Sequence, residues 1–170
     1  MASATMSVAR SEDAFCVRLG GRCTLEQSPV FHEFAERTLR DSSSPVYVDA
    51  GDCEYLDSTF LGSLLDLHRK FGRGDGGRFF LVAPDDARER LFAAMRLTNV
   101  FAFAPDTPAP LGNWVEICSG ASPSNAEMAK HIMECHRRLA ETDCPGKKAF
   151  AMIADNLEKE LAAAPPPKSK

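Results

Sequence analysis

Two short apolar runs separated by a helical pattern constrain the fold of this chain most strongly. Residues 46–50 (VYVDA) and 78–82 (RFFLV) are rich in the β-branched and aromatic side chains of buried strands. Between them, Leu61, Leu64 and Leu65 are spaced as one face of a helix. A crossover of this kind places the two strands parallel in one sheet. The sequence therefore predicts an α/β domain with a largely parallel sheet.

The neighbouring segments extend this alternation of strands and helices. They predict a strand at 14–19 that ends at Gly20-Gly21, a helix over 28–39 with Ser28 as N-cap, a helix over 85–95 and an edge strand at 100–103. Residues 51–57 are predicted as a loop at the C-terminal end of the strand 46–50. Functional loops of parallel sheets lie at that end.

The C-terminal part predicts a helical hairpin. A capping-box pattern at 124–127 opens one amphipathic helix, and a second apolar stripe follows the turn at 143–146. The apolar faces of the two helices need a partner surface, either the chain's own domain or a second copy. We expect five segments: a lead-in (1–12), a domain (13–105), a proline-containing linker (106–123), a two-helix extension (124–162) and a disordered tail (163–170).

The acidic residues are concentrated in one stretch. The net charge is −4 at pH 7, yet no Lys or Arg lies between Arg40 and Arg69. This stretch holds Asp41, Asp49, Asp52, Glu54, Asp57 and Asp66. Because phosphate contacts require basic side chains, we expect no direct binding to nucleic acid.

Neither the apolar runs nor the N-terminus point to a membrane. The chain lacks a run of about 18 apolar residues, and residues 1–10 lack a signal-peptide core. We expect a cytoplasmic protein.

The cysteines do not predict a metal site. None of the six forms a Cys-x-x-Cys pair. A zinc donor set would combine Cys135, His131 and His136 with Cys118 or Cys144, and this spacing matches no standard site. We expect reduced thiols and no metal or other cofactor.

Nor does the sequence indicate an enzyme. A nucleophilic Ser58 would need His68 or His32 as its base, and His68 lies about three helical turns away. The glycine-rich segment 72–77 precedes a strand, whereas phosphate-binding loops precede a helix. We therefore expect no catalytic residue, and the local pattern alone predicts Ser58 as a helix N-cap.

Four segments together resemble the STAS domain, which sulfate transporters and anti-sigma factor antagonists share. They are 46–50 (VYVDA), 55–65 (YLDSTFLGSLL), 77–84 (GRFFLVAP) and 91–101 (LFAAMRLTNVF). The resemblance covers about residues 12–105 in order and spacing. It implies a STAS-type mixed β-sheet with helices packed mainly on one side, followed here by the C-terminal helical hairpin. Without a membrane segment, the transporter branch is excluded.

The antagonist branch implies a phosphorylation site. In its Asp-Ser-Ser/Thr-Gly motif, the serine after Asp is phosphorylated by a serine protein kinase that is also an anti-sigma factor. The matching residue is Ser58, with Thr59 as the alternative acceptor, and Asp57 and Asp49 match the acidic positions beside it. The unphosphorylated antagonist binds the kinase and frees the sigma factor. Phosphorylation releases the antagonist, and a serine phosphatase resets it.

The motif departs from the family at one position. Phe60 stands where the family has glycine, and the next glycine is Gly62. We expect Phe60 and Leu61 to contact the partner. Since the acidic neighbours of Ser58 include no cation, we expect the charge of a phosphate there to be uncompensated and to repel a docked partner. The alternative is a STAS scaffold or interaction module that works without phosphorylation.

Overall fold

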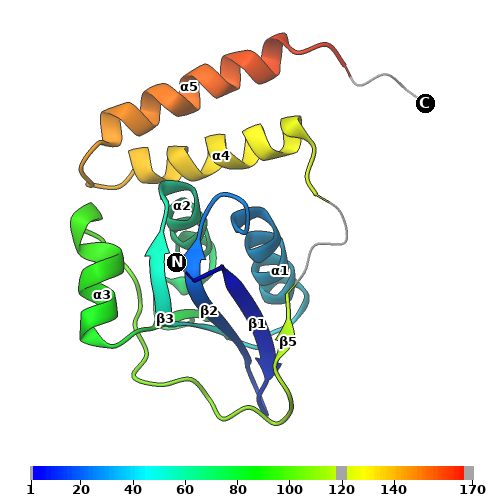
Figure 1. Cartoon of the computed structure of the whole chain (residues 1–170), viewed down its shortest axis with the longest axis vertical. Helices are drawn as coiled ribbons and strands as arrows, with labels where there is room; N and C mark the ends of the chain where they lie inside the picture. The colour runs from blue at the N-terminus through cyan, green and yellow to red at the C-terminus, as the bar shows by residue number, and fades with distance from the viewer. Residues whose placement is uncertain (1, 118–121, 167–170) are drawn as a thin grey trace.

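The computed structural model describes residues 2–117 and 122–166, and a five-stranded mixed sheet forms its centre (Figure 1). The strands are β1 (Thr5–Arg10), β2 (Phe15–Cys23), β3 (Val46–Leu56), β4 (Phe79–Val82) and β5 (Val115–Glu116). Their order is β4-β3-β2-β1-β5. Strands β2, β3 and β4 are parallel, whereas β1 is antiparallel to both β2 and β5. The predicted mixed α/β fold is confirmed.

Helices cover mainly one face of this sheet. They are α1 (Ser28–Asp41), α2 (Ser58–Leu67) with the π-helical turn η1 (His68–Gly72), and α3 (Asp85–Phe92) with the 3₁₀ turn η2 (Ala93–Met95). Alternate residues of β3, such as Val46 and Val48, share one apolar core with α1 and α2. On the other face, Tyr47 and Phe80 are half-buried and stack with ring centroids 5.0 Å apart. The helices therefore leave this second face only partly covered.

The acidic segment predicted as a loop is instead the second half of β3. It pairs in parallel with Gly20 and the residues up to Cys23, so β2 does not end at the two glycines as predicted. The pairing of β2 with β3 is irregular here: it has two register shifts, and Gly21 has a positive φ of 66°. Glycine adopts such an angle at little cost. As a result, Asp52 and Glu54 are exposed on a strand.

Three further expectations need correction. The lead-in contains β1, whose neighbours in the sheet supply its hydrogen bonds. Residues 100–103 do not form a strand, because only an isolated bridge joins Phe103 to Leu81. The segment expected as a linker contains β5, which extends the sheet beyond β1.

The C-terminal hairpin folds back onto the domain. Its helices are α4 (Asn125–Ala140) and α5 (Lys147–Ala163), and the predicted capping box joins Ser124 to Glu127. Figure 1 shows α4 lying across α2, with α5 on the outer side of α4. Self-association through these helices stays a prediction. The predicted disordered tail lies partly outside the described residues, since α5 extends to Ala163 and the description ends at 166.

Among the described residues, no helix combines the length and apolarity required to cross a membrane.

Candidate functional site

Asp57 and Ser58 form the start of α2. Asp57 is the N-cap: its Oδ1 accepts a hydrogen bond from the Phe60 N–H at 2.8 Å, and its Oδ2 accepts one from the Leu25 N–H at 2.7 Å. Ser58 is therefore the first helical residue and not the cap that the local pattern predicts. Its half-buried hydroxyl lies 3.0 Å from Nε2 of His136, on α4. The side chain of Ser58 is thus free of a capping role.

The residues that follow Ser58 face the interior. Thr59 and Leu61 are each 3% exposed, and Phe60 is fully buried and stacks on Phe31 with centroids 4.9 Å apart. A partner that docks on this conformation cannot reach Phe60 or Leu61, so the expectation that they are partner contacts needs correction. The reason is that α2 packs against α1 and α4 and shares the apolar core with the sheet.

Asp49 does not join this site. On β3 it alternates with the core residues Val48 and Ala50, so its side chain faces the side of the sheet away from them. Its Oδ1 accepts a hydrogen bond from the Gly51 N–H at 2.9 Å, which closes a local turn. The structure brings Asp57 to Ser58 but leaves Asp49 on the other face.

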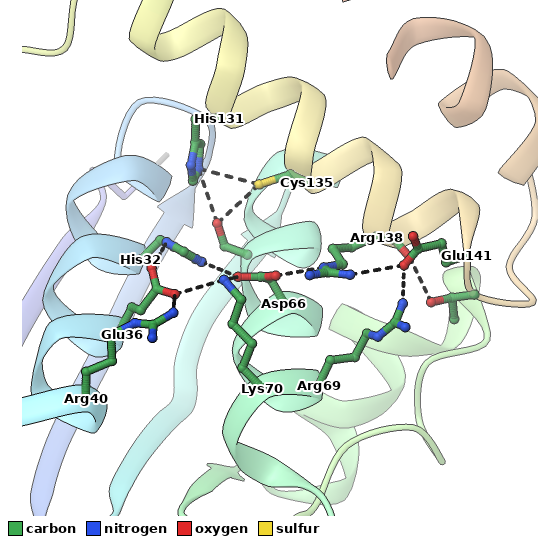
Figure 2. Close-up of polar contacts among 12 residues, drawn as sticks. His32, Glu36, Arg40, Asp66, Arg69, Lys70, His131, Cys135, Arg138 and Glu141 are labelled. Atoms are coloured by element: carbon green, nitrogen blue, oxygen red, sulfur yellow. Dashed lines mark hydrogen bonds and ion pairs between the residues drawn. The ribbon is translucent and has the colours of Figure 1, made fainter. Parts of the chain in front are cut away.

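A largely buried polar cluster joins α2, α1 and α4, and Figure 2 shows its α4 members His131 and Cys135. The Ser28 hydroxyl lies 2.6 Å from the Ser63 hydroxyl and 2.8 Å from Nε2 of His131. Ser63 Oγ lies 3.2 Å from the same nitrogen and 3.4 Å from Cys135 Sγ. Burial lowers the pKa of His131 to about 4 and raises the pKa of the Cys135 thiol to about 12. Both groups are therefore neutral at pH 7.

Asp66, further along α2, is a second link to α4. Its carboxylate accepts hydrogen bonds from Arg138 Nε at 2.7 Å and Lys70 Nζ at 2.9 Å, and it lies 2.7 Å from His32 Nε2. Burial alone would raise the pKa of Asp66, but the hydrogen bonds outweigh it and hold the pKa well below its ordinary value. Figure 2 shows this carboxylate between α1 and α4. Asp66 is thus a charged anchor for α4.

The larger part of this chain matches a known protein family. The model of the STAS domain, described as Mlab, matches residues 6–103, which include Asp57, Ser58 and all of α2. This chain belongs to the STAS domain family. The crystal structure of an anti-sigma factor antagonist from Mycobacterium paratuberculosis is similar, with a TM-score of 0.50 and 24% identity over 61% of this chain and 87% of that chain. This likeness shows a shared fold. None of the curated proteins compared with the chain matches it.

The hairpin that covers α2 lies outside the matched STAS domain. The helix α4 lies very close to α2 at Gly62: a Cβ at this position would lie 2.5 Å from the Cβ of Cys135, nearer than real Cβ contacts come. This close approach requires glycine at 62. It also accounts for the glycine that stands two positions later than in the family motif.

Sequence reasoning missed the residues of α4 that complete the site. His136 is 78 positions from Ser58 in the chain, and Arg138 is 72 from Asp66. A sequence signal for the contact with α4 is present in α2 itself. Small or polar residues recur there at helical spacing in an otherwise apolar helix. They are Thr59, Gly62, Ser63 and Asp66. Such a stripe predicts a second packing partner with polar side chains.

The residues weighed above as a catalytic base or as zinc donors have other surroundings in the described parts of the chain. His32 contacts Asp66, and His68 Nδ1 faces Gly72, so neither is a base for Ser58. Within the described ranges, Nδ1 of His136 has no hydrogen-bond partner, so no third group orients it as in a catalytic triad. No group of three or more His, Cys, Asp or Glu residues in these ranges could hold a metal ion, and Cys118 lies outside them.

Proposed function

We propose that this STAS protein is a partner-switching regulator of the anti-sigma factor antagonist type. In the proposal, a serine kinase that is also an anti-sigma factor binds the unphosphorylated chain, phosphorylates Ser58 and then releases it. A serine phosphatase reverses the modification. The observation that carries the proposal is the position of Ser58, directly after the capping Asp57 on the first turn of α2 in a STAS domain. In the proposal, binding, phosphorylation and release take place in the cytoplasm, and the chain itself catalyses no reaction.

The first turn of α2 suits a phosphorylated serine. Backbone N–H groups at a helix N-terminus favour negative charge by about 0.3–1 kcal/mol, so the domain tolerates the phosphate without refolding. A phosphoryl group adds about −1.5 to −2 charge beside the Asp57 carboxylate. A partner that fits the neutral surface then meets charge repulsion and desolvation, which lower its affinity.

The surroundings of Ser58 differ in one respect from the sequence expectation. The sequence predicts a site without a cationic group beside Ser58, whereas in the structure the imidazole of His136, which can become cationic, contacts the Ser58 hydroxyl. Burial lowers the pKa of His136, although the nearby Asp57 acts in the opposite direction. The imidazole is therefore neutral at pH 7 while α4 is docked, and it supplies no positive charge until it is protonated.

Phosphate mapping tests this proposal. The protein is incubated with ATP and each anti-sigma factor kinase of the same organism, and phosphorylated residues are located by mass spectrometry. We expect phosphate on Ser58, because Thr59 is buried, and none on the Ser58→Ala variant. Absence of phosphate from both Ser58 and Thr59 would favour the phosphorylation-independent module.

Kinase binding tests the electrostatic step. We expect Ser58→Ala to retain kinase affinity and Ser58→Asp to weaken it at least tenfold in a calorimetric titration. Ser43→Asp is the matched control, because it adds the same charge at an exposed serine in the loop before β3. Equal affinities of the three variants would contradict switching by charge.

One observation favours the second candidate, a module that binds its partner without phosphate control. The Ser58 hydroxyl is half-buried under α4, so a kinase cannot engage it in this conformation. The two candidates differ in whether α4 ever leaves this position.

A further inference from the structure

We propose that the C-terminal hairpin is an intramolecular lid, which occupies the switch surface in place of the partner and must leave before Ser58 reacts. The lid is defined as residues 125–163, helices α4 and α5 with their joining turn. The switch surface is the side of α2 that carries Ser58, Gly62, Ser63 and Asp66. The effect of the lid on phosphorylation rests on the proposed function of Ser58, whereas its release can be measured without any kinase.

The lid lies over the reacting hydroxyl. Nε2 of His136 is 3.0 Å from Ser58 Oγ, a distance that leaves no space for a nucleotide γ-phosphate between them. Phosphoryl transfer requires the hydroxyl to approach the phosphorus in line with the leaving oxygen. The docked α4 occupies the space from which this approach is made, so the lid and a kinase exclude each other.

The contacts between the lid and the switch surface are mostly polar. They include the Ser58–His136 pair, the hydroxyls around His131 and the Asp66–Arg138 ion pair. The neutral hydrogen bonds among these are exchanged for bonds to water when the lid leaves, so their net contribution to docking is small, whereas the charged Asp66–Arg138 pair contributes more. The buried Nδ1 of His136, which lacks a partner in the described parts of the chain, opposes docking. These neutral polar contacts therefore hold the lid less firmly than apolar packing holds the core.

The apolar anchors of the lid are few. Leu139 and Cys144 are buried in the main core cluster, and Phe150 packs against it from the first turns of α5. In the remaining length of α5, Ala154 alone among the described residues is fully buried. The matched STAS domain ends at residue 103. The domain thus has its sheet, α1, α2 and α3 without the lid, apart from the two residues of β5.

The docked lid shows what kind of partner fits the switch surface. Gly62 admits the backbone of one crossing helix, and Asp66 offers a carboxylate to a basic side chain beside that crossing. We therefore expect the partner to present an amphipathic helix with an arginine or lysine placed as Arg138 is in α4. A partner helix of this chemistry competes directly with α4.

Gly62→Ala tests whether the lid is releasable. The added methyl group collides with the α4 backbone at Cys135, while alanine strengthens α2 itself, since it is a better helix former than glycine. The readout is alkylation of Cys135 under native conditions, located by mass spectrometry. Cys23 and Cys53, both fully buried in the core, report global opening in the same molecules. Gly76→Ala is the matched control, because a Cβ there meets no atom within 4 Å.

We expect Gly62→Ala to speed alkylation of Cys135 at least tenfold, while Cys23 and Cys53 react as slowly as in the unaltered chain. If Cys135 reacts no faster, or only in step with Cys23, the hairpin is a permanent part of the fold and the lid is refuted.

A reversible lock tests the effect of the lid on Ser58. Ser63 Oγ lies 3.4 Å from Cys135 Sγ, so Ser63→Cys places two thiols in contact across α2 and α4. Oxidised glutathione takes up the two electrons and two protons of the thiols and leaves a disulfide, which dithiothreitol reduces. With the kinase that the phosphate mapping identifies, we expect phosphorylation of Ser58 to fall at least tenfold on oxidation and to recover on reduction. The unaltered chain with and without oxidant is the control.

The outcomes separate the two proposals. If Ser58 is phosphorylated equally fast in the oxidised and reduced Ser63→Cys variant, the lid proposal fails and the proposed function stands. If no kinase phosphorylates Ser58 under any condition, the proposed function fails, and alkylation of Cys135 still decides whether the lid opens.

Discussion

Acidification should release the lid, because docking suppresses the protonation of His131. This imidazole faces His32 on α1 and Asp66 on α2, with the Ser28 and Ser63 hydroxyls in contact and Cys135 on its own helix. Burial and the nearby His32 lower the pKa of His131, and only Asp66 opposes them. A histidine whose pKa is lower when docked binds more protons when released. Docking is therefore most stable above the ordinary pKa and weakens as the pH falls toward the docked pKa.

The magnitude follows from the two pKa values of His131. The pKa is about 4 when docked and 6.5 when the side chain is free in water. Between pH 7.5 and pH 5, linkage predicts a loss of about 2 kcal/mol in docking free energy, roughly a 30-fold shift of the equilibrium. Below pH 4 the loss approaches about 3 kcal/mol. His136 acts in the same direction, since burial also lowers its pKa.

Hydrogen–deuterium exchange at pH 7.5, 6 and 5 measures this effect, with rates corrected for the intrinsic pH dependence of amide exchange. Protection of α4 is compared with protection of β3, which reports the domain core. We expect α4 to lose about 30-fold in protection at pH 5 while β3 changes little. His131→Gln, which cannot titrate, should remove most of the dependence. Unchanged protection of α4 down to pH 5, or the same loss in the variant, would refute the assignment to His131.

Three further substitutions have defined outcomes. Phe60→Ala removes a fully buried ring stacked on Phe31 and should lower the free energy of unfolding in urea by about 3–5 kcal/mol, where a surface contact residue would change it little. Asp57→Ala removes the N-cap of α2 and should destabilise the domain by about 1–2 kcal/mol in the same assay, without any partner present. Arg138→Ala leaves Asp66 with His32 and Lys70, so we expect the alkylation of Cys135 to rise about tenfold while the urea midpoint of the domain stays within a few tenths of a molar.

Local patterns predicted the centre of the fold correctly. The strands at 46–50 and 78–82 and the helix between them are found as β3, β4 and α2, because each carries its own periodic apolar residues. The amphipathic hairpin was also predicted, together with the alternative that it folds back onto the domain. The sequence alone does not show which strands pair with each other. The segment β1 (TMSVAR) has no apolar run and is a strand because β2 and β5 flank it.

The site was predictable only where it is contiguous in the chain. Asp57 and Ser58 are neighbours in one motif, so the sequence alone places them together, and phosphorylation of Ser58 stays a prediction. Asp49 was grouped with them by its position in the sequence, yet strand alternation sends its side chain to the other face of the sheet. His136 comes to Ser58 from a segment outside the family pattern, and only the docking of α4 on α2 reveals the contact.

Tethering the lid to the same chain has a consequence for how strongly a partner must bind. A tethered helix has a local concentration that does not depend on how much protein the cell makes, commonly in the millimolar range for short flexible connections. The apparent dissociation constant of a competing partner rises by the inverse of the open fraction, so a lid closed about 99% of the time raises it about 100-fold. The chain itself thus determines how strongly a partner must bind. Gly62 is one of the residues that set this threshold, because its lack of a side chain lets α4 pack closely on α2.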